Sequence, residues 1–143
     1  MDSPKGRGAQ GNRTSTRFNL PVRQADGDWL DARGEVDGGA PPLATSVTVV
    51  HPRSIISRNA SPDIPFDQSL NAYQGCEHGC IYCYARPSHA FHDLSPGLDF
   101  ESRLFAKPDA PALLRAALAR RGHVPTPIAM GTNTDPYQPI EAT

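Results

Sequence analysis

All three cysteines of the chain stand in one short stretch, YQGCEHGCIYCYARPSH, which covers residues 73–89. They are Cys76, Cys80 and Cys83, so their spacing is Cys-x3-Cys-x2-Cys. Thiolates this close along the chain can converge on one inorganic centre, and Gly75 and Gly79 permit the sharp turns that such wrapping requires. A four-iron cluster is usually held by four thiolates, so three would leave one iron without a protein ligand. The stretch therefore predicts a metal centre with an open coordination position.

Three blocks of sequence extend this pattern, and they are NAYQGCEHGCIYCYARPSH, SPGLDFESRLFAKPDAP and GTNTDPYQPIE, in that order. The cysteine spacing, with the aromatic Tyr82 just before the last cysteine, resembles the signature of the radical S-adenosylmethionine (SAM) superfamily. Over residues 53–141 the chain resembles an uncharacterised bacterial group related to spore photoproduct lyase and often called DNA-repair photolyase. The three blocks together make this resemblance more specific than the cysteine spacing alone.

The resemblance implies that Cys76, Cys80 and Cys83 hold a [4Fe-4S] cluster whose fourth iron binds the amino and carboxylate groups of SAM. An electron from a reductant such as flavodoxin or ferredoxin would then cleave SAM to methionine and a 5'-deoxyadenosyl radical, which removes a hydrogen atom from the substrate. The relation to spore photoproduct lyase suggests nucleic acid as the substrate and a lyase-like reaction, although a fold does not determine a function. The expected activity is therefore that of a radical SAM enzyme.

The same resemblance implies a set of cofactor-binding residues. The backbone at Tyr82 is expected to contact the adenine of SAM. A polar segment that follows the next strand is expected to contact the methionine amino group, and its candidates are Thr132, Asn133 and Asp135. Ligands gather at the carboxyl ends of parallel strands in α/β proteins, which agrees with this position. Arg86 would either meet a carboxylate or phosphate of a ligand or lie at the surface.

A structural zinc site is the alternative, with three cysteines and His78, His89 or His92 as the fourth ligand. The protein would then be a zinc-stabilised nucleic-acid-binding module without catalysis. Its basic N-terminal arm could touch the nucleic acid, since residues 1–23 carry one acid and five basic residues, which are Lys5, Arg7, Arg13, Arg17 and Arg23. A solvated basic tail is the simpler explanation of that charge. The flanking sequence blocks favour the iron–sulfur interpretation.

The cysteine stretch must be positioned by regular elements on both sides. The patterns predict strands at residues 46–50, 70–73, 99–106 and 126–131 and a helix at residues 110–121. The last strand has the apolar run of a buried parallel strand, and Asp109 is expected to cap the helix. Residues 54–70 are expected to be irregular, because Pro62 and Pro65 remove backbone donors. The order of strand, helix and strand favours a βα repeat with a parallel sheet.

The predicted fold class is α/β. Residues 45–143 are interpreted as the incomplete N-terminal part of the partial (β/α)6 TIM-type barrel that the resemblance implies. Residues 1–44 contain seven of the 12 glycines and follow neither hydrophobic period, which predicts a disordered or loosely structured tail. A chain of 143 residues is shorter than the roughly 200 residues that such a barrel needs. The missing units are therefore expected to be cut off or to come from another chain.

Composition and charge say little more about partners or cellular location. The net charge of -1 points to no particular partner. No apolar run approaches the roughly 20 residues that span a bilayer, and the N-terminus lacks the apolar core of a secretory signal. We therefore expect a cytoplasmic protein that does not enter a membrane. A reducing compartment also suits a cluster of thiols better than a disulfide framework.

Overall fold

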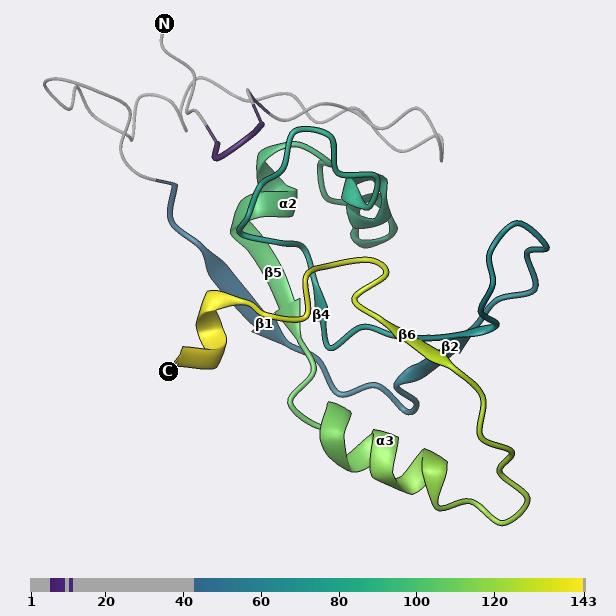
Figure 1. Cartoon of the computed structure of the whole chain (residues 1–143). Coiled ribbons are helices and arrows are strands. Elements are labelled where there is room, and N and C mark those ends of the chain that lie inside the picture. Colours follow the sequence, from purple (N-terminus) through teal and green to yellow (C-terminus); the bar gives the residue numbers. More distant parts are fainter. Residues whose placement is uncertain (1–5, 10, 12–42, 143) are drawn as a thin grey trace, which may run out of the picture.

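The structure is a computed structural model that describes residues 6–9, 11 and 43–142 (Figure 1). Its strands are short and belong to two separate three-stranded sheets. In chain order the elements are β1 (Ser46–Val49), β2 (Ile56–Arg58), β3 (Gln68–Leu70), β4 (Tyr73–Gln74), the 3-10 helix η1 (Arg86–His92), α2 (Leu98–Ser102), β5 (Arg103–Ala106), α3 (Ala110–Leu118), β6 (Ile128–Met130) and the 3-10 helix η2 (Pro139–Ala142). Within the described ranges, every helix is too short or too polar to traverse a bilayer.

The first sheet has the strand order β1-β5-β4 and carries the strand that leads into the cysteines. β1 runs parallel to β5, and β4 runs antiparallel to it. The strand predicted at residues 46–50 is confirmed as β1, where β-branched side chains suit an extended backbone. Leu104 on β5 is almost fully buried, so the middle strand of this sheet lies in the interior.

The second sheet has the strand order β2-β3-β6 and packs against α3 (Figure 1). β2 and β3 form an antiparallel pair, and β3 runs parallel to β6. Ile55, Leu70 and Ala110 form a small buried core, against which Leu113 and Leu114 of α3 pack. The predicted helix is therefore confirmed over Ala110–Leu118, and its apolar face is the one that contacts the sheet.

Asp109 stands at the N-terminus of α3 but makes no side-chain cap. Its carboxylate is instead hydrogen-bonded to Nδ1 of His51, which follows β1. The expected cap is therefore wrong, because an imidazole from another segment takes the carboxylate.

Three other expectations about the elements are corrected. Residues 54–70 are not irregular, since β2 and β3 pair there and Pro62 and Pro65 lie in the connection between them. The strand at residues 126–131 is parallel but not buried, because it is an edge strand on which Met130 is 61% exposed. β5 and β6 lie in different sheets, so the strand, helix and strand around α3 do not form one continuous parallel sheet.

Residues 99–106, predicted as one strand, begin as the helix α2 and become β5 only at Arg103. The apolar residues of this stretch fit either structure, but the helical turn buries Phe100 completely. The carbonyl oxygen of Phe100 then accepts the backbone N–H of Cys76 at 2.9 Å. The switch from helix to strand thus fixes the start of the cysteine stretch.

Both sheets mix a parallel and an antiparallel pair, and the described residues form no closed barrel. The partial barrel therefore stays a prediction.

The cysteine stretch follows β4, and residues 131–135 follow β6. The parallel partner of β6 is β3, which ends just before β4. The connection from β3 to β4 and residues 131–135 thus leave the same end of the second sheet, and β4 of the first sheet then leads into the cysteine stretch. Of the predicted tail at residues 1–44, only residues 6–9, 11, 43 and 44 are described, and the rest of that range lies outside the described residues.

His89 on η1 is fully buried between aromatic rings. Its Nε2 lies 2.8 Å from the carbonyl oxygen of Arg103, and its ring centroid lies 5.2 Å from that of Phe100. Burial, which disfavours the charged imidazolium, lowers the pKa of His89 below its ordinary value of 6.5. Burial also lowers the pKa of His92, which the positive charge of Lys107 lowers further.

We therefore expect the protein to lose stability as the pH falls below about 6.5, because the unfolded chain then binds protons that the folded chain does not. His89 would contribute up to about 1.4 kcal/mol for each pH unit between its unfolded and folded pKa. Urea unfolding across this range measures the loss. His89→Gln should show a weaker acid dependence, whereas His123→Gln should retain the full dependence because His89 is still present. An equally steep dependence in His89→Gln would contradict this origin.

Candidate metal centre

The cysteine loop, defined as residues 75–86, leaves β4 through a turn that requires glycine. Gly75 has a φ of 78° and Gly79 a φ of 62°, both in the left-handed region that other residues rarely adopt. A Cβ atom on Gly75 would lie 2.9 Å from the ring of His89 and 3.0 Å from the carbonyl oxygen of Phe100. The expectation that these glycines shape the turns of the loop is confirmed.

The three thiols are free and differ in exposure. Cys76 is buried with Ala85 and Phe100, Cys83 packs half-buried against the same group, and Cys80 is exposed. Within the described part of the chain, no three His, Cys, Asp or Glu side chains are grouped closely enough to hold a metal ion. Thiolates are the ligands that iron–sulfur clusters take, and this loop carries three of the usual four.

Gln138, eight residues after β6, is hydrogen-bonded to the cysteine loop. Its side chain is buried, and its Nε2 donates to Sγ of Cys76 at 3.3 Å and to the carbonyl oxygen of Asp135 at 3.0 Å. Its Oε1 accepts the backbone N–H of Glu77 at 3.2 Å. Donors to a sulfur ligand tune the electronic properties of the metal that it binds. Gln138 carries no local sequence signal for this role, because it lies 62 positions from Cys76.

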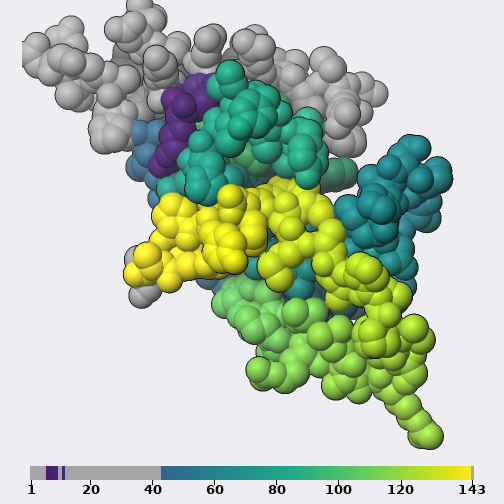
Figure 2. Space-filling model, in the orientation of Figure 1, coloured from purple at the N-terminus to yellow at the C-terminus, as the bar shows by residue number. Residues whose placement is uncertain are grey.

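The candidate cofactor residues after β6 lie beside the cysteine loop. Asn71, between β3 and β4, binds this segment, since its Nδ2 donates to Oγ1 of Thr132 at 3.1 Å and its Oδ1 accepts the N–H of Asn133 at 2.8 Å. Oδ2 of Asp135 lies 3.3 Å from Nε2 of His78 inside the loop. Figure 2 shows this segment, in yellow, lying across the face next to the teal residues. The structure thus brings Thr132 and Asp135 into contact with Tyr84 and His78 of the cysteine loop, while Asn133 contacts Asn71. Asn71 is a positioning residue that the sequence did not reveal.

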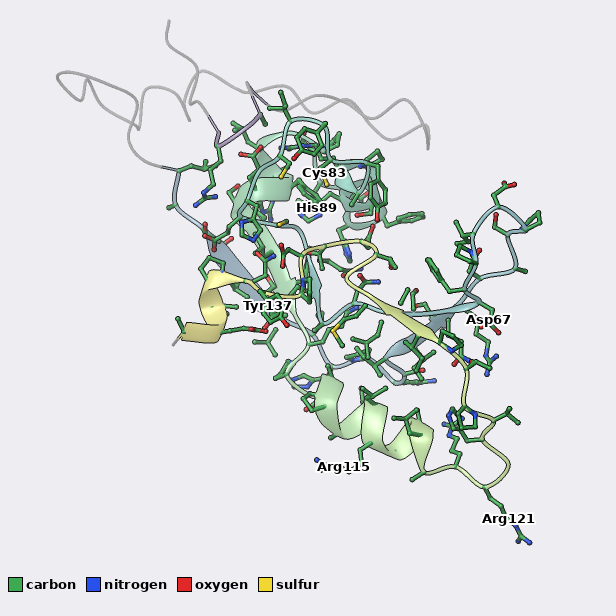
Figure 3. The ribbon with its side chains drawn as sticks, viewed as in Figure 1. Asp67, Cys83, His89, Arg115, Arg121 and Tyr137 are labelled. Atoms are coloured by element: carbon green, nitrogen blue, oxygen red, sulfur yellow. The ribbon has the colours of Figure 1, made fainter. Side chains whose placement is uncertain are left out.

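Aromatic side chains stand exposed around the cysteine loop. Tyr82, expected to contact adenine through its backbone, is 86% exposed, and Tyr84 and Tyr137 are also exposed, as is the neighbouring aliphatic Ile81. The hydroxyl of Tyr84 donates to the carbonyl oxygen of Thr132, which is a second link between the loop and the segment after β6. Figure 3 shows Cys83 at the α2 end of the molecule and Tyr137 on the segment after β6. The adenine contact at Tyr82 stays a prediction.

Tyr73 on β4 has a different environment from these exposed rings. Its hydroxyl donates to Oε1 of Glu141 at 2.8 Å. Burial and the bond to the Glu141 carboxylate raise the pKa of Tyr73 to about 12. The phenol is therefore neutral at physiological pH and ties β4 to η2.

Arg86 serves neither as a surface residue nor as a free anion ligand, so both expectations for it are corrected. Its Nη2 lies 2.5 Å from Oε1 of Glu101, and the guanidinium is largely buried. It also donates to the carbonyl oxygens of Gly79 at 2.8 Å and Cys80 at 3.0 Å. A guanidinium fork suits several acceptors at once, so Arg86 cross-links the cysteine loop to α2.

The three histidines considered as a fourth zinc ligand have other contacts. His78 lies beside Asp135, and Nε2 of His89 lies beside the carbonyl oxygen of Arg103. Nε2 of His92 lies 3.0 Å from Oε1 of Gln74. The zinc-stabilised module therefore stays a prediction.

Comparison with known proteins places the chain near uncharacterised relatives. Uncharacterised proteins of Mycobacterium bovis and Mycobacterium tuberculosis are 45% identical to it over 78 residues. The match covers 54% of this chain and 23% of each relative, so the chain matches about a quarter of the length of these proteins. No family model matches the chain, and no solved structure matches it.

Proposed function

We propose that this chain contributes the cluster-binding part of a radical SAM enzyme, with Cys76, Cys80 and Cys83 as the ligands of a [4Fe-4S] cluster. The observation that carries the proposal is the packing of residues 131–138 against the cysteine loop. Two stretches that are far apart in the sequence and carry the expected ligands of cluster and cofactor thus meet at one end of the molecule. By resemblance, the substrate we propose is nucleic acid.

The chain's own residues would bind and orient the cofactors. When bound, the cluster would supply the electron that cleaves SAM. Asn71, just before β4, fixes Thr132 and Asn133 after β6, and Asp135 contacts His78 of the cysteine loop. Arg86 fixes the carbonyl groups of Gly79 and Cys80, and so restricts the turn between the first two cysteines. Positioning of this kind is what a protein adds to cofactor chemistry.

Anaerobic reconstitution with iron and sulfide tests the proposal. We expect a brown protein that holds about four irons, as a four-iron cluster requires, and that releases 5'-deoxyadenosine from SAM after reduction. A colourless protein that takes up one zinc ion and no iron would contradict the proposal and support the zinc-stabilised module. The mycobacterial relatives, of which the match covers 23%, offer the same test on a longer chain.

Gln138→Leu should lower the reduction potential of the reconstituted cluster. Its amide donates to the Cys76 sulfur, and such a donor stabilises the more negative, reduced state. Spectroelectrochemical titration under anaerobic conditions measures the midpoint reduction potential. A shift of about 59 mV in this potential corresponds to a tenfold change in a one-electron equilibrium. Gln74→Leu is the control, since Gln74 is bonded to His92 rather than to sulfur. Equal midpoints in Gln138→Leu and the wild type would contradict the assigned role.

A further inference from the structure

Glu101 on α2 is a fully buried carboxylate with an unusual number of donors. Three backbone amides from the N-terminal region point at it. They belong to Arg7 at 2.6 Å, Gly8 at 3.2 Å and Ala9 at 2.7 Å. The fourth donor is Arg86, at 2.5 Å. A buried charge is tolerated when its oxygens are paired and hydrogen-bonded in this way.

Gly6–Ala9 form a compact turn that presents these amides together. The backbone N–H of Gly6 donates to the carbonyl oxygen of Ala9 at 2.9 Å, which closes the turn. Successive amides that converge on one point make a nest for an anion. Here the anion is a carboxylate of the same chain.

The side chain of Arg7 adds contacts on either side of the nest. Its Nη1 donates to the backbone oxygen of Glu101 at 2.7 Å, and its Nη2 lies 3.2 Å from Oγ1 of Thr45 and 3.4 Å from Oε2 of Glu77. Glu77 belongs to the cysteine loop. Arg7 was expected to belong to a loose basic arm. Its guanidinium instead pairs with acceptors of the same chain.

The nest also touches the cysteine loop directly. A Cβ atom on Gly8 would lie 1.7 Å from the carbonyl oxygen of Gly79, and one on Gly6 would lie 2.5 Å from Cδ2 of Leu98. Only a residue without a side chain fits at Gly8, because the obstacle is backbone rather than a flexible side chain. Figure 2 shows these residues, in purple, packed against the teal part of the chain.

We propose that Gly6–Ala9 act as a strap that positions the cysteine loop through Glu101 and Arg86. The carboxylate binds the strap on one side and Arg86 on the other, and Arg86 in turn holds the backbone oxygens of Gly79 and Cys80. The strap thus sets the conformation of the turn between Cys76 and Cys80. Its action does not depend on which metal the thiols bind.

Hydrogen exchange of the metal-free full chain tests the strap without any cofactor. In Gly8→Val, the amides of residues 76–86 should exchange faster by roughly tenfold or more, the change that losing one or two buried hydrogen bonds makes in a local opening equilibrium. Exchange in the hairpin of β2 and β3 should stay unchanged. Gly11→Val is the matched control, since a Cβ there meets nothing within 4 Å.

Arg7→Ala keeps the backbone nest and removes only the guanidinium contacts. It should therefore give a smaller acceleration confined to the same loop, and Arg7→Lys should restore part of the protection. The strap would be refuted if Gly8→Val exchanged like Gly11→Val in residues 76–86, or if every element accelerated equally in both Gly8→Val and Arg7→Ala.

Discussion

Replacing Cys80 with alanine is expected to abolish assembly of a stable four-iron cluster on this chain. The three thiols are the only cysteines in the sequence, so each variant leaves two sulfur donors on the loop. Cys80 gives the clearest test, because its exposed side chain contributes little to the folded core, whereas Cys76 is buried. Iron and sulfide per chain after anaerobic reconstitution, with the visible absorption, measure the loss.

The histidines provide the matched control for the cysteine variants. His78→Gln and His92→Gln should keep the iron content of the wild type, because the proposed ligands are sulfur atoms alone. Retention of a four-iron cluster by Cys80→Ala would contradict the assignment of the ligands. Loss of metal in a histidine variant with the cysteines intact would favour a site of three cysteines and one histidine.

Arg86→Gln should destabilise the fold by about 3–5 kcal/mol, the usual effect of breaking a buried ion pair from one side. The variant leaves the carboxylate of Glu101 buried without its cationic partner, and removes the donors to Gly79 and Cys80. A loss of this size is a large fraction of the stability of a small domain. Urea unfolding followed by circular dichroism measures it.

Arg115→Gln on α3 is the matched control, since its side chain projects away from the fold (Figure 3) and should change stability by less than about 0.5 kcal/mol. Equal stabilities of Arg86→Gln and Arg115→Gln would show that the pair is not a structural link.

The regular elements were predictable where the signal is local. The β-branched run at residues 46–50 and the apolar face of the helix around Leu113 and Leu114 follow from short-range pattern, and both are observed. Residues 99–106 were predicted as a single strand. The first part is instead the helix α2, in which Phe100 is fully buried beside the cysteine loop, and that tertiary contact has no local signal. The pairing of β2 with β3 was missed, since it depends on partners across a proline-rich connection.

In the candidate site, too, local features were predictable and long-range contacts were not. The thiols stand out by residue type and spacing, whereas the polar residues after β6 were expected from the resemblance; in the structure Asp135 of that segment contacts His78 of the cysteine loop. The residues that hold them were not found, because each contact joins distant segments: Gln138 with Cys76, Asn71 with Asn133, and Glu101 with the strap at residues 6–9. A single glutamine, asparagine or glutamate carries no local mark of such a role.

The most direct test of the central claim is electron paramagnetic resonance of the reduced, reconstituted protein with and without SAM. If three cysteines leave one iron open, SAM binds that iron and the spectrum must change on its addition, while Cys80→Ala shows no cluster signal. A cluster spectrum that is identical with and without saturating SAM, or a protein that holds only zinc, would contradict the account.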